Sequence, residues 1–411
     1  MEAAPAAEAL HPALAWRRAG LMAVSGQADG PGLVAPVAIA SAADGALAAL
    51  RAIAPEADLP PSGALLLGER ARLLGLRRQG SISPNGSCRL LRARDGMVAL
   101  NLPRADDWAL LPALFGDEGV TDWRTAAAAA AGQPGAALVA QGRLLGLAIA
   151  AEEAAPAPAS PFIIQRHAPP VPPSARPLVL DFTSLWAGPL AGGLLAAAGA
   201  RVIKIESRGR PDGARGGSAA FYDLLNQNKQ SVAVDFRDRD EMAWLRRLVG
   251  RADIVLDAAR PRALAALGID AGAEAARGAT WIAVTAHGRT GEAANWIGFG
   301  DDAAVAGGLS AAMARAWGTS LFAGDAIADP LTGITAALAA WAGWRAGGGR
   351  LVDIALSRVV AHAIALHAAE NIRAWQKLAE TDPAPLYPMR AAGRRARALG
   401  ADNGALFAEF R

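Results

Sequence analysis

The stretch RPLVLDFTSLWAGPLAGGLLAAAGARVIKIES, residues 176–207, carries the pattern that decides the fold of this 411-residue chain. It begins with the apolar run LVLDF, passes through a glycine-bearing turn and a run of small apolar residues, and ends with RVIKIES. Two short runs rich in Val, Ile and Leu around a helix-length segment are typical of a βαβ unit, whose strands lie parallel. The stretch therefore predicts two parallel strands joined by a helix.

The same alternation continues toward the C-terminus. Strand-like runs at 230–236, 253–258 and 280–288 alternate with helix-like segments at 239–252 and 261–267. Regular alternation of this kind is typical of α/β proteins in which helices cover both faces of a parallel sheet. We therefore expect a Rossmann-like, doubly wound parallel sheet within residues 178–411.

The sequence before residue 178 predicts a different organisation. Residues 151–177 are rich in proline and small residues, which indicates an extended linker. Residues 85–150 predict a smaller α+β domain, with a strand at 96–102 and a helix at 104–116. This small domain would lie on the N-terminal side of the Rossmann-like domain.

Residues 1–84 contain a segment that resembles a later part of the chain. A shift of 288 positions aligns Gly20–Ala52 with Gly308–Ala340 without gaps, and nearly half of the aligned positions are identical. About half of these identities are alanines, so alanine-rich low complexity is one explanation. The matching glycines and branched residues favour a true internal duplication, in which residues 1–84 form a partial copy of the large domain.

Composition narrows the classes of function. Hydrophobic residues make up 53% of the chain and charged residues 19%, which is typical of a globular protein. The net charge is only +3 and the basic residues lie among acids, which disfavours nucleic-acid binding. One cysteine, Cys88, and five histidines make a disulfide or a metal site unexpected. We found neither a signal peptide nor a membrane-spanning stretch in the sequence and expect a cytoplasmic protein.

The turn AGPLAGG at 187–193 partly resembles a dinucleotide-binding fingerprint. It precedes a helix, and Glu206 closes the next strand, close to where the fingerprint has its acidic residue. Pro189 interrupts the usual glycine spacing that begins at Gly188, however. The turn could bring the backbone close to an anion, or its glycines could serve only tight packing of the helix on the sheet.

Polar and basic side chains gather near the ends of the predicted strands. Arg208 and Arg215 follow the second strand in a glycine-rich loop, Asn228 and Lys229 adjoin the third, and Arg260 follows the fourth. Ligands of open α/β sheets bind at the carboxyl ends of the strands. These side chains could therefore hold phosphates, although the loop with Arg208 and Arg215 could also be a solvated surface loop.

Two adjacent acids, Asp301 and Asp302, stand in the apolar stretch IGFGDDAAVAGG at 297–308. Aspartates after a glycine often begin a helix, so capping alone could explain both. A carboxylate nucleophile or base held at a helix start is the functional alternative. His287 precedes the two acids in the strand-end loop TAHGRTG at 285–291 and could approach the same site.

Taken in order, these motifs resemble the class III coenzyme A transferases, the group with formyl-CoA transferase, carnitine CoA-transferase and α-methylacyl-CoA racemase. The resemblance runs from VLDFTSLWAGPLAGG through NQNKQSVAVDF, VTAHGRTG and GFGDDAAVAGG to DAIADPLTGITAALAAW and GGGRLVDIALSR. It covers about residues 177–365, and LGADNGALFAEF near the C-terminus resembles the closing segment of the family.

The resemblance implies a Rossmann-like domain that binds coenzyme A and needs no metal. Asp301 matches the catalytic carboxylate, which attacks an acyl-CoA to give a mixed anhydride and then an enzyme-bound CoA thioester that a carboxylic acid collects. Asp302 falls at a variable position. The residues that would contact CoA are Gly188, Pro189, Glu206, Arg208, Arg215, Asn228, Lys229 and Arg260. Acyl-CoA racemisation with Asp301 and His287 as acid and base, or CoA binding without catalysis, are the alternatives.

Several residues depart from the family pattern. Trp186 replaces a glutamine often found in oxalate-type transferases, and Gly300 stands where the racemases typically have histidine. The family places its small domain after the large one, whereas here it comes first. The chain thus resembles a fused, truncated pair with at most one active site, because LHPALAWRRA at 10–19 has no counterpart of Asp301. The family forms interlocked dimers, so we expect a homodimer, although one fused chain could imitate part of that ring.

Overall fold

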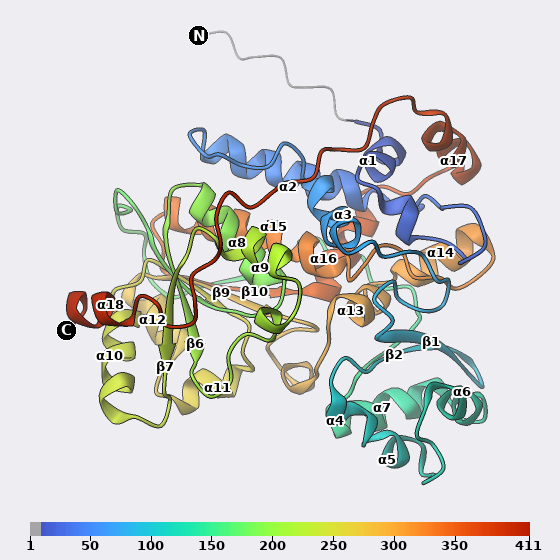
Figure 1. Cartoon of the computed structure of the whole chain (residues 1–411), viewed down its shortest axis with the longest axis horizontal. Helices are drawn as coiled ribbons and strands as arrows, with labels where there is room; N and C mark the ends of the chain where they lie inside the picture. The colour runs from blue at the N-terminus through green and yellow to red at the C-terminus, as the bar shows by residue number, and fades with distance from the viewer. Residues whose placement is uncertain (1–9) are drawn as a thin grey trace.

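A seven-stranded sheet forms the centre of the computed structural model, which describes residues 10–411 (Figure 1). Across the sheet the strands follow the order β4-β10-β9-β8-β5-β6-β7, with all neighbours parallel except the edge pair β4 and β10. The strands are β4 (Ile163–Arg166), β5 (Leu178–Phe182), β6 (Arg201–Ser207), β7 (Gln230–Val234), β8 (Ile254–Asp257), β9 (Thr280–Thr285) and β10 (Arg350–Ala355). From β5 to β10 this is the 3-2-1-4-5-6 order of Rossmann sheets. The predicted α/β class with a parallel sheet is confirmed.

Helices cover both faces of this sheet because its strands are apolar on both sides. One apolar cluster contains α8 (Ala187–Ala197), α9 (Ala219–Asn226) and α15 (Ala328–Arg345). A second cluster on the other face contains α10 (Arg239–Val249), α12 (Ala271–Arg277) and α18 (Asn403–Glu409). The short helix α11 (Pro261–Ala266) follows β8. Neighbouring residues of one strand serve opposite faces, as Val179 and Leu180 do in β5.

The glycines of α8 allow this helix to approach its neighbours closely. A Cβ atom on Gly188 would lie 2.2 Å from Cβ of Thr183, and one on Gly193 would lie 2.9 Å from the carbonyl oxygen of Leu225. Real Cβ atoms do not approach this closely, so only glycine fits at Gly188. Tight packing therefore accounts for the glycines of AGPLAGG without a ligand.

The N-terminal residues pack on the Rossmann sheet and share its core. Helices α1 (Pro12–Arg18), α2 (Ile39–Ile53) and α3 (Gly63–Leu74) place apolar side chains in the same cluster as α8 and α15. At the shift of 288 positions, α1 corresponds to α13 (Gly300–Ala306), and α2 corresponds to most of α15. The 3-10 helix η1 (Leu21–Val24) corresponds to the start of α14 (Leu309–Trp317). These correspondences are those expected of a duplication, which stays a prediction.

Residues 85–150 contain a separate apolar core. The antiparallel strands β1 (Cys88–Ala93), β2 (Gly96–Asn101) and β3 (Ala148–Ala151) form a three-stranded sheet. Four helices accompany it: α4 (Ala105–Trp108), α5 (Leu111–Phe115), α6 (Trp123–Ala131) and α7 (Gly135–Leu145). The core lies between this sheet and the helices α5 to α7. In Figure 1 this unit lies below the N-terminal helices and beside the Rossmann sheet.

Two connecting segments contain more structure than their composition indicates. The predicted linker 151–177 includes β4, whose four residues are exposed and pair with β10. At the other end of the chain, α16 (Leu356–Leu366) and α17 (Ile372–Thr381) lead into residues 382–402, which we call the C-terminal strap. The strap crosses the molecule from α17 to α18 beside β7 (Figure 1). No helix within residues 10–411 is long and apolar enough to cross a membrane.

Candidate active site

The two adjacent acids differ in their surroundings at the start of α13. Asp302 is fully buried, and its Oδ1 accepts hydrogen bonds from the Phe299 backbone N–H at 2.9 Å and from Asn101 Nδ2 at 2.8 Å. A carboxylate that accepts the N–H of the residue before the helix stabilises the helix start. Capping, which could have explained both acids, is therefore the role of Asp302.

Asp301 is also buried, but its hydrogen-bond donors come from two distant parts of the chain. Its Oδ2 accepts from Asn85 Nδ2 at 2.9 Å, and its Oδ1 accepts from the backbone N–H of Ala326 at 2.8 Å. Ala326 has a φ of 41°, a left-handed conformation that is costly for a residue with a Cβ atom. Leu185, beside Trp186, has a φ of 69°, and no other non-glycine residue among those described has a positive φ. Such conformations cluster at functional sites, where the surrounding structure maintains them.

Two further carboxylates and one guanidinium accompany Asp301. Arg70 of α3 donates from Nε and Nη2 to the two oxygens of Asp325, at 2.7 Å and 2.6 Å. The guanidinium carbon of Arg70 lies 4.4 Å from the centre of the Trp186 ring. Asp329 approaches the start of α13 so closely that a Cβ atom on Gly300 would lie 2.3 Å from its Oδ2. The site therefore combines three aspartates with one arginine.

Burial and crowding of carboxylates raise the pKa of Asp301 to about 6. Removal from water is the main cause and the nearby Asp325 adds to it, whereas Arg70 and the two hydrogen bonds partly oppose the rise. The pKa of Asp329 rises to about 7, chiefly through burial. At neutral pH, Asp301 is thus mostly ionised but poorly solvated, a state that suits a nucleophile.

Our sequence-based search missed Arg70, Asn85, Asp325 and Asp329, although the repeat contains a signal for the acids. In the register of 288 positions, the acids at 301, 325 and 329 correspond to Ala13, Val37 and Ser41. At this shift the N-terminal segment has no acid at any of the three positions, and this contrast is the signal in the sequence. Arg70 and Asn85 have no local pattern, and only the fold brings them to Asp301.

His287, predicted as a second catalytic residue, lies on the Asp302 side of the helix start. A Cβ atom on Gly298 would be 2.7 Å from Asp302 Oδ2 and 2.9 Å from His287 Nε2. The carboxylate oxygen and the imidazole nitrogen therefore both lie beside Gly298. The pKa of His287 falls to about 4, mainly through burial and further through Arg143. His287 is therefore neutral near pH 7, and its catalytic role stays a prediction.

Glu206, Arg215 and Lys229, three of the residues expected to contact CoA, are engaged in ion pairs within the chain. Arg215 donates to both oxygens of Glu206, at 2.9 Å and 2.5 Å. Lys229 is buried and donates to Asp181 at 2.7 Å and to the carbonyl of Pro189 at 2.8 Å. Burial lowers the pKa of Lys229 to about 8, and Asp181 opposes this shift. These groups hold the loops around α8, which differs from the direct ligand contact that we expected.

Arg208 and Arg260 lie at the carboxyl ends of β6 and β8 and are exposed. Arg208 pairs with Glu241 at 2.7 Å, with half of its side chain accessible. Between these two strands lies β5, and the strand order reverses at β5 and β8, where Rossmann-type sheets bind their ligands. Both arginines could therefore reach an anionic ligand at this edge.

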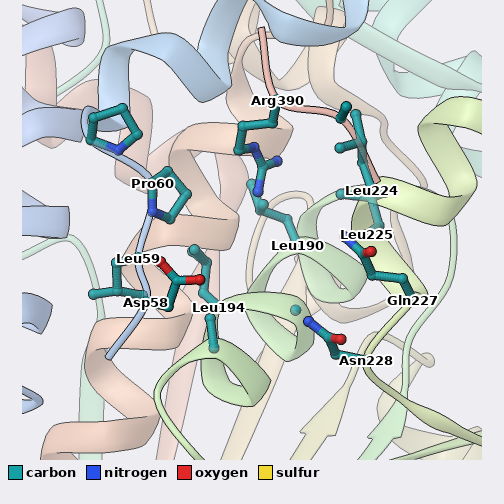
Figure 2. Close-up of a pocket in the computed structure, with 14 residues that line it drawn as sticks. Asp58, Leu59, Pro60, Leu190, Leu194, Leu224, Leu225, Gln227, Asn228 and Arg390 are labelled. Carbon is teal, nitrogen blue, oxygen red and sulfur yellow. The ribbon is translucent and has the colours of Figure 1, made fainter. Parts of the chain in front are cut away.

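Asn228 precedes β7 and so lies apart from the loops that follow β6 and β8. It lines a cavity of about 360 Å³ between α8, the end of α9 and residues 58–61 (Figure 2). Arg390 of the strap also lines this cavity, where it pairs with Glu69 at 2.5 Å. A neighbouring cavity of about 320 Å³ contains Asn228, Lys229 and three strap arginines, Arg394, Arg395 and Arg397. Within residues 10–411, no group of three or more His, Cys, Asp or Glu has an arrangement suited to a metal ion.

Comparison with known proteins assigns the chain to a family. The sequence profile of CoA-transferase family III matches residues 177–398, more than half of the chain. The chain belongs to CoA-transferase family III. The resemblance inferred from the ordered motifs is therefore confirmed.

Individual members of CoA-transferase family III match only part of this chain. Over 200 residues the chain is 34% identical to succinyl-CoA–D-citramalate CoA-transferase of Chloroflexus aurantiacus. This alignment covers 44% of the chain and 49% of that protein. Over 206 residues the chain is 31% identical to succinate–glutarate CoA-transferase of Agrobacterium fabrum, covering 45% and 51%. The chain thus spans about half the length of the curated relatives it matches. A crystal structure of the hypothetical protein Rv3272 from Mycobacterium tuberculosis matches 48% of this chain and 58% of that one, with 29% identity and a TM-score of 0.42.

Proposed function

We propose that this protein transfers coenzyme A from an acyl-CoA to a carboxylic acid, with Asp301 as the nucleophile. The observation that carries the proposal is the environment of Asp301 at the start of α13. Its carboxylate is buried, each oxygen accepts one hydrogen bond, and the pKa is about 6. Membership of CoA-transferase family III supports the reaction class.

The proposed reaction begins with attack of an Asp301 oxygen on the thioester carbonyl of the acyl-CoA. The carbon–sulfur bond breaks, the CoA thiolate leaves, and an acyl–aspartyl anhydride remains. The thiolate then attacks the side-chain carbonyl carbon of Asp301, which releases the carboxylate of the first acyl group and leaves an aspartyl-CoA thioester. An acceptor carboxylate attacks this thioester, and the departing thiolate takes the new acyl group from the resulting anhydride. Asp301 is regenerated as a carboxylate, and no proton needs to be transferred.

The hydrogen-bond donors that contact Asp301 would also stabilise the oxyanions that form during this reaction. Each attack on the side-chain carbonyl of Asp301 places negative charge on one of its oxygens. The amide of Asn85 lies 2.9 Å from Oδ2 and the backbone N–H of Ala326 lies 2.8 Å from Oδ1, so whichever oxygen carries this charge already has one donor in place. A donor arranged in advance beside a developing oxyanion lowers the barrier, typically by about 3–4 kcal/mol in acyl transfer.

We propose that the nucleotide part of CoA binds at the carboxyl edge of the Rossmann sheet. Arg208 and Arg260 are exposed there, and guanidinium groups suit phosphate binding. Glu206, Arg215 and Lys229 would shape the surrounding loops through their ion pairs rather than contact the ligand. Gly188 and Pro189 would border the ligand through their backbone.

The names of the relatives suggest the first substrates to test. Succinyl-CoA appears as donor in the name of the Chloroflexus relative, and succinate and glutarate appear in that of the Agrobacterium relative. Succinyl-CoA with glutarate is therefore our first pair. Trp186 replaces a glutamine often found in oxalate-type transferases, which leaves the acyl group open, so a panel of short acyl-CoA donors should accompany this pair.

The decisive experiment traps the aspartyl thioester. Incubation with acyl-CoA and then hydroxylamine should convert Asp301 to a hydroxamate that peptide mass spectrometry locates. Asp301→Asn should abolish the label, whereas Asp302→Asn, a change of the same size one residue away, should keep it.

Exchange of the α-hydrogen in deuterated water without CoA transfer would instead support the racemase, with Asp301 and His287 as acid and base. Stabilisation by CoA with neither reaction would support a binding protein.

We also propose a homodimer in the cytoplasm as the working form. Light scattering coupled to size-exclusion chromatography tests the oligomeric state. A monomeric mass would favour the alternative, in which one fused chain imitates part of the interlocked ring of the family.

A further inference from the structure

The ion pair between Arg70 and Asp325 joins residues 10–84, which we call the N-terminal module, to the candidate active site. Arg70 belongs to α3, whereas Asp325 precedes α15 and is fully buried. The pair is bidentate, with nitrogen–oxygen distances of 2.7 Å and 2.6 Å, and the guanidinium also stacks on Trp186. The proposed transfer does not use this pair, and its position next to the nucleophile needs an explanation.

Asn85 links the pair directly to the nucleophile. Its Nδ2 lies 2.9 Å from Asp301 Oδ2 and 3.4 Å from Asp325 Oδ1. The two carboxylates therefore share one donor group, and the shorter contact goes to Asp301. Asp325 can leave the amide mainly to Asp301 because Arg70 satisfies both of its own oxygens.

Charged and titratable groups face Asp301 from several elements of the fold. They are Arg70 on α3, Cys88 on β1, Asp302 on α13, Asp325 before α15 and Asp329 on α15. Arg70 is the cation of this set, and the other members are acids. Without it, Asp325 would repel a negative charge on Asp301 at close range, in surroundings where charges interact strongly.

We infer that Arg70 is a positioning residue for Asp301: by clamping Asp325, it leaves the Asn85 amide to the nucleophile and keeps Asp301 ionised for attack. The inference rests on the proposed role of Asp301. The N-terminal module, which lacks counterparts of the three site acids, therefore contributes to catalysis through Arg70. The competing explanation is that the ion pair is only a structural staple, which holds the N-terminal module on the Rossmann-like domain without affecting Asp301.

The two explanations differ in how activity depends on pH. Removal of the positive charge by Arg70→Met should make Asp301 harder to ionise. In the pH profile of the transfer or trapping rate, the acid limb, where the rate rises as Asp301 ionises, should therefore move to higher pH by about one unit or more. Asp325→Asn removes the repelling charge and should move the limb downward. The double variant should return it close to the wild-type position. Arg77→Met, which removes an exposed arginine near the end of α3, is the matched charge control and should leave the profile unchanged.

A staple would give a different result. Arg70→Met would then lower stability, and would lower the rate by one factor at every pH, with no displacement of the acid limb. Opposite displacements in the two single variants support the inference, and equal or absent displacements overturn it. If Arg70→Met does not fold, Asp325→Asn and the charge-retaining Arg70→Lys decide: the first should move the limb downward and the second should leave it in place.

A measurement without turnover separates this inference from the proposed function. The difference in unfolding free energy between the wild type and Asp301→Asn, followed against pH, reports the ionisation of Asp301 in the native state. In the Arg70→Met background, the midpoint of this difference should move upward by about one unit or more. If the wild type gives no hydroxamate with any donor, the proposed transfer fails, and this profile alone decides the role of Arg70. An unmoved midpoint refutes that role even if the enzyme is active.

Discussion

Replacement of Asp302 by asparagine should stabilise the protein at neutral pH. The gain in unfolding free energy over the wild type should grow as pH rises. Asp302 is fully buried, and only its Oδ1 has hydrogen-bond donors among residues 10–411. Its Oδ2 lies near Nε2 of His287, which is also without a partner in this part of the chain. An asparagine keeps an acceptor for Asn101 and Phe299, and its amide group could donate toward His287. The substitution therefore removes a buried charge while it retains the helix start.

The size of the effect follows from the pKa of Asp302. Burial above all raises this pKa from 3.8 to about 7, and the hydrogen bond from Asn101 opposes the rise. Because the pKa of Asp302 is higher in the native state than in the unfolded state, protonated Asp302 favours the native state. This contribution is fully present below about pH 4 and is lost as pH rises through 7. A rise of about three units at 1.36 kcal/mol each amounts to about 4 kcal/mol. Asp302→Asn should gain this amount over the wild type between about pH 4 and pH 8.

Urea denaturation of the full chain at a series of pH values measures the effect. The difference in unfolding free energy between Asp302→Asn and the wild type should rise through this range and level off above it, with unchanged m-values. Asp106→Asn, at an exposed aspartate of the small unit, is the matched control. If the Asp302→Asn and wild-type curves run parallel across the range, the desolvation of Asp302 does not govern its ionisation, and our assignment of its environment is wrong.

Three further substitutions test the packing around the site. Lys229→Met should lower the free energy of unfolding by about 3–5 kcal/mol because it leaves Asp181 as an unpaired buried charge, and adding Asp181→Asn should recover part of the loss in urea denaturation. Gly188→Ala should cost at least about 2 kcal/mol, since the new Cβ would lie 2.2 Å from Thr183, and a calorimetric Tm that stays at the wild-type value would contradict this packing. Ala326→Gly should raise stability by roughly 0.5–1 kcal/mol because glycine tolerates the φ of 41°, and a lower Tm would show that the alanine is not strained.

The sequence predicted the central fold because the relevant pattern is local. Within 176–207, the strand-like runs correspond to β5 and β6, and the small residues between them form α8. The order of the strands and the division of helices between two faces then follow from general rules for βαβ units. The strand β4 escaped prediction because its exposed residues lie in a proline-rich stretch and pair with β10, far along the chain.

The candidate site was predictable only in part. Asp301 was singled out through the ordered motifs that resemble the family, and its catalytic role stays a prediction. Capping was offered as an explanation for both acids, and only the fold distinguishes Asp302 as the cap. The group around Asp301 was not predicted, because Arg70 and Asn85 reach it from segments that lie far from it in the sequence. For the same reason, Lys229 and Arg215 carry charges that suit a phosphate, while their partners within the chain became visible only in the fold.

The route of the C-terminal strap has a consequence for synthesis of the protein. Arg18 in α1 pairs with Asp382 across 364 positions, and the backbone of Val34 donates to Gln376 across 342 positions. His11 packs edge-on against the ring of Trp375, at a centroid distance of 5.0 Å. At about 5–20 residues per second, a ribosome delivers these C-terminal partners roughly 20–70 s after the N-terminal helices. During that interval the nascent N-terminal module keeps part of its apolar surface uncovered, so the chain should depend on holding chaperones until residues 375–382 emerge.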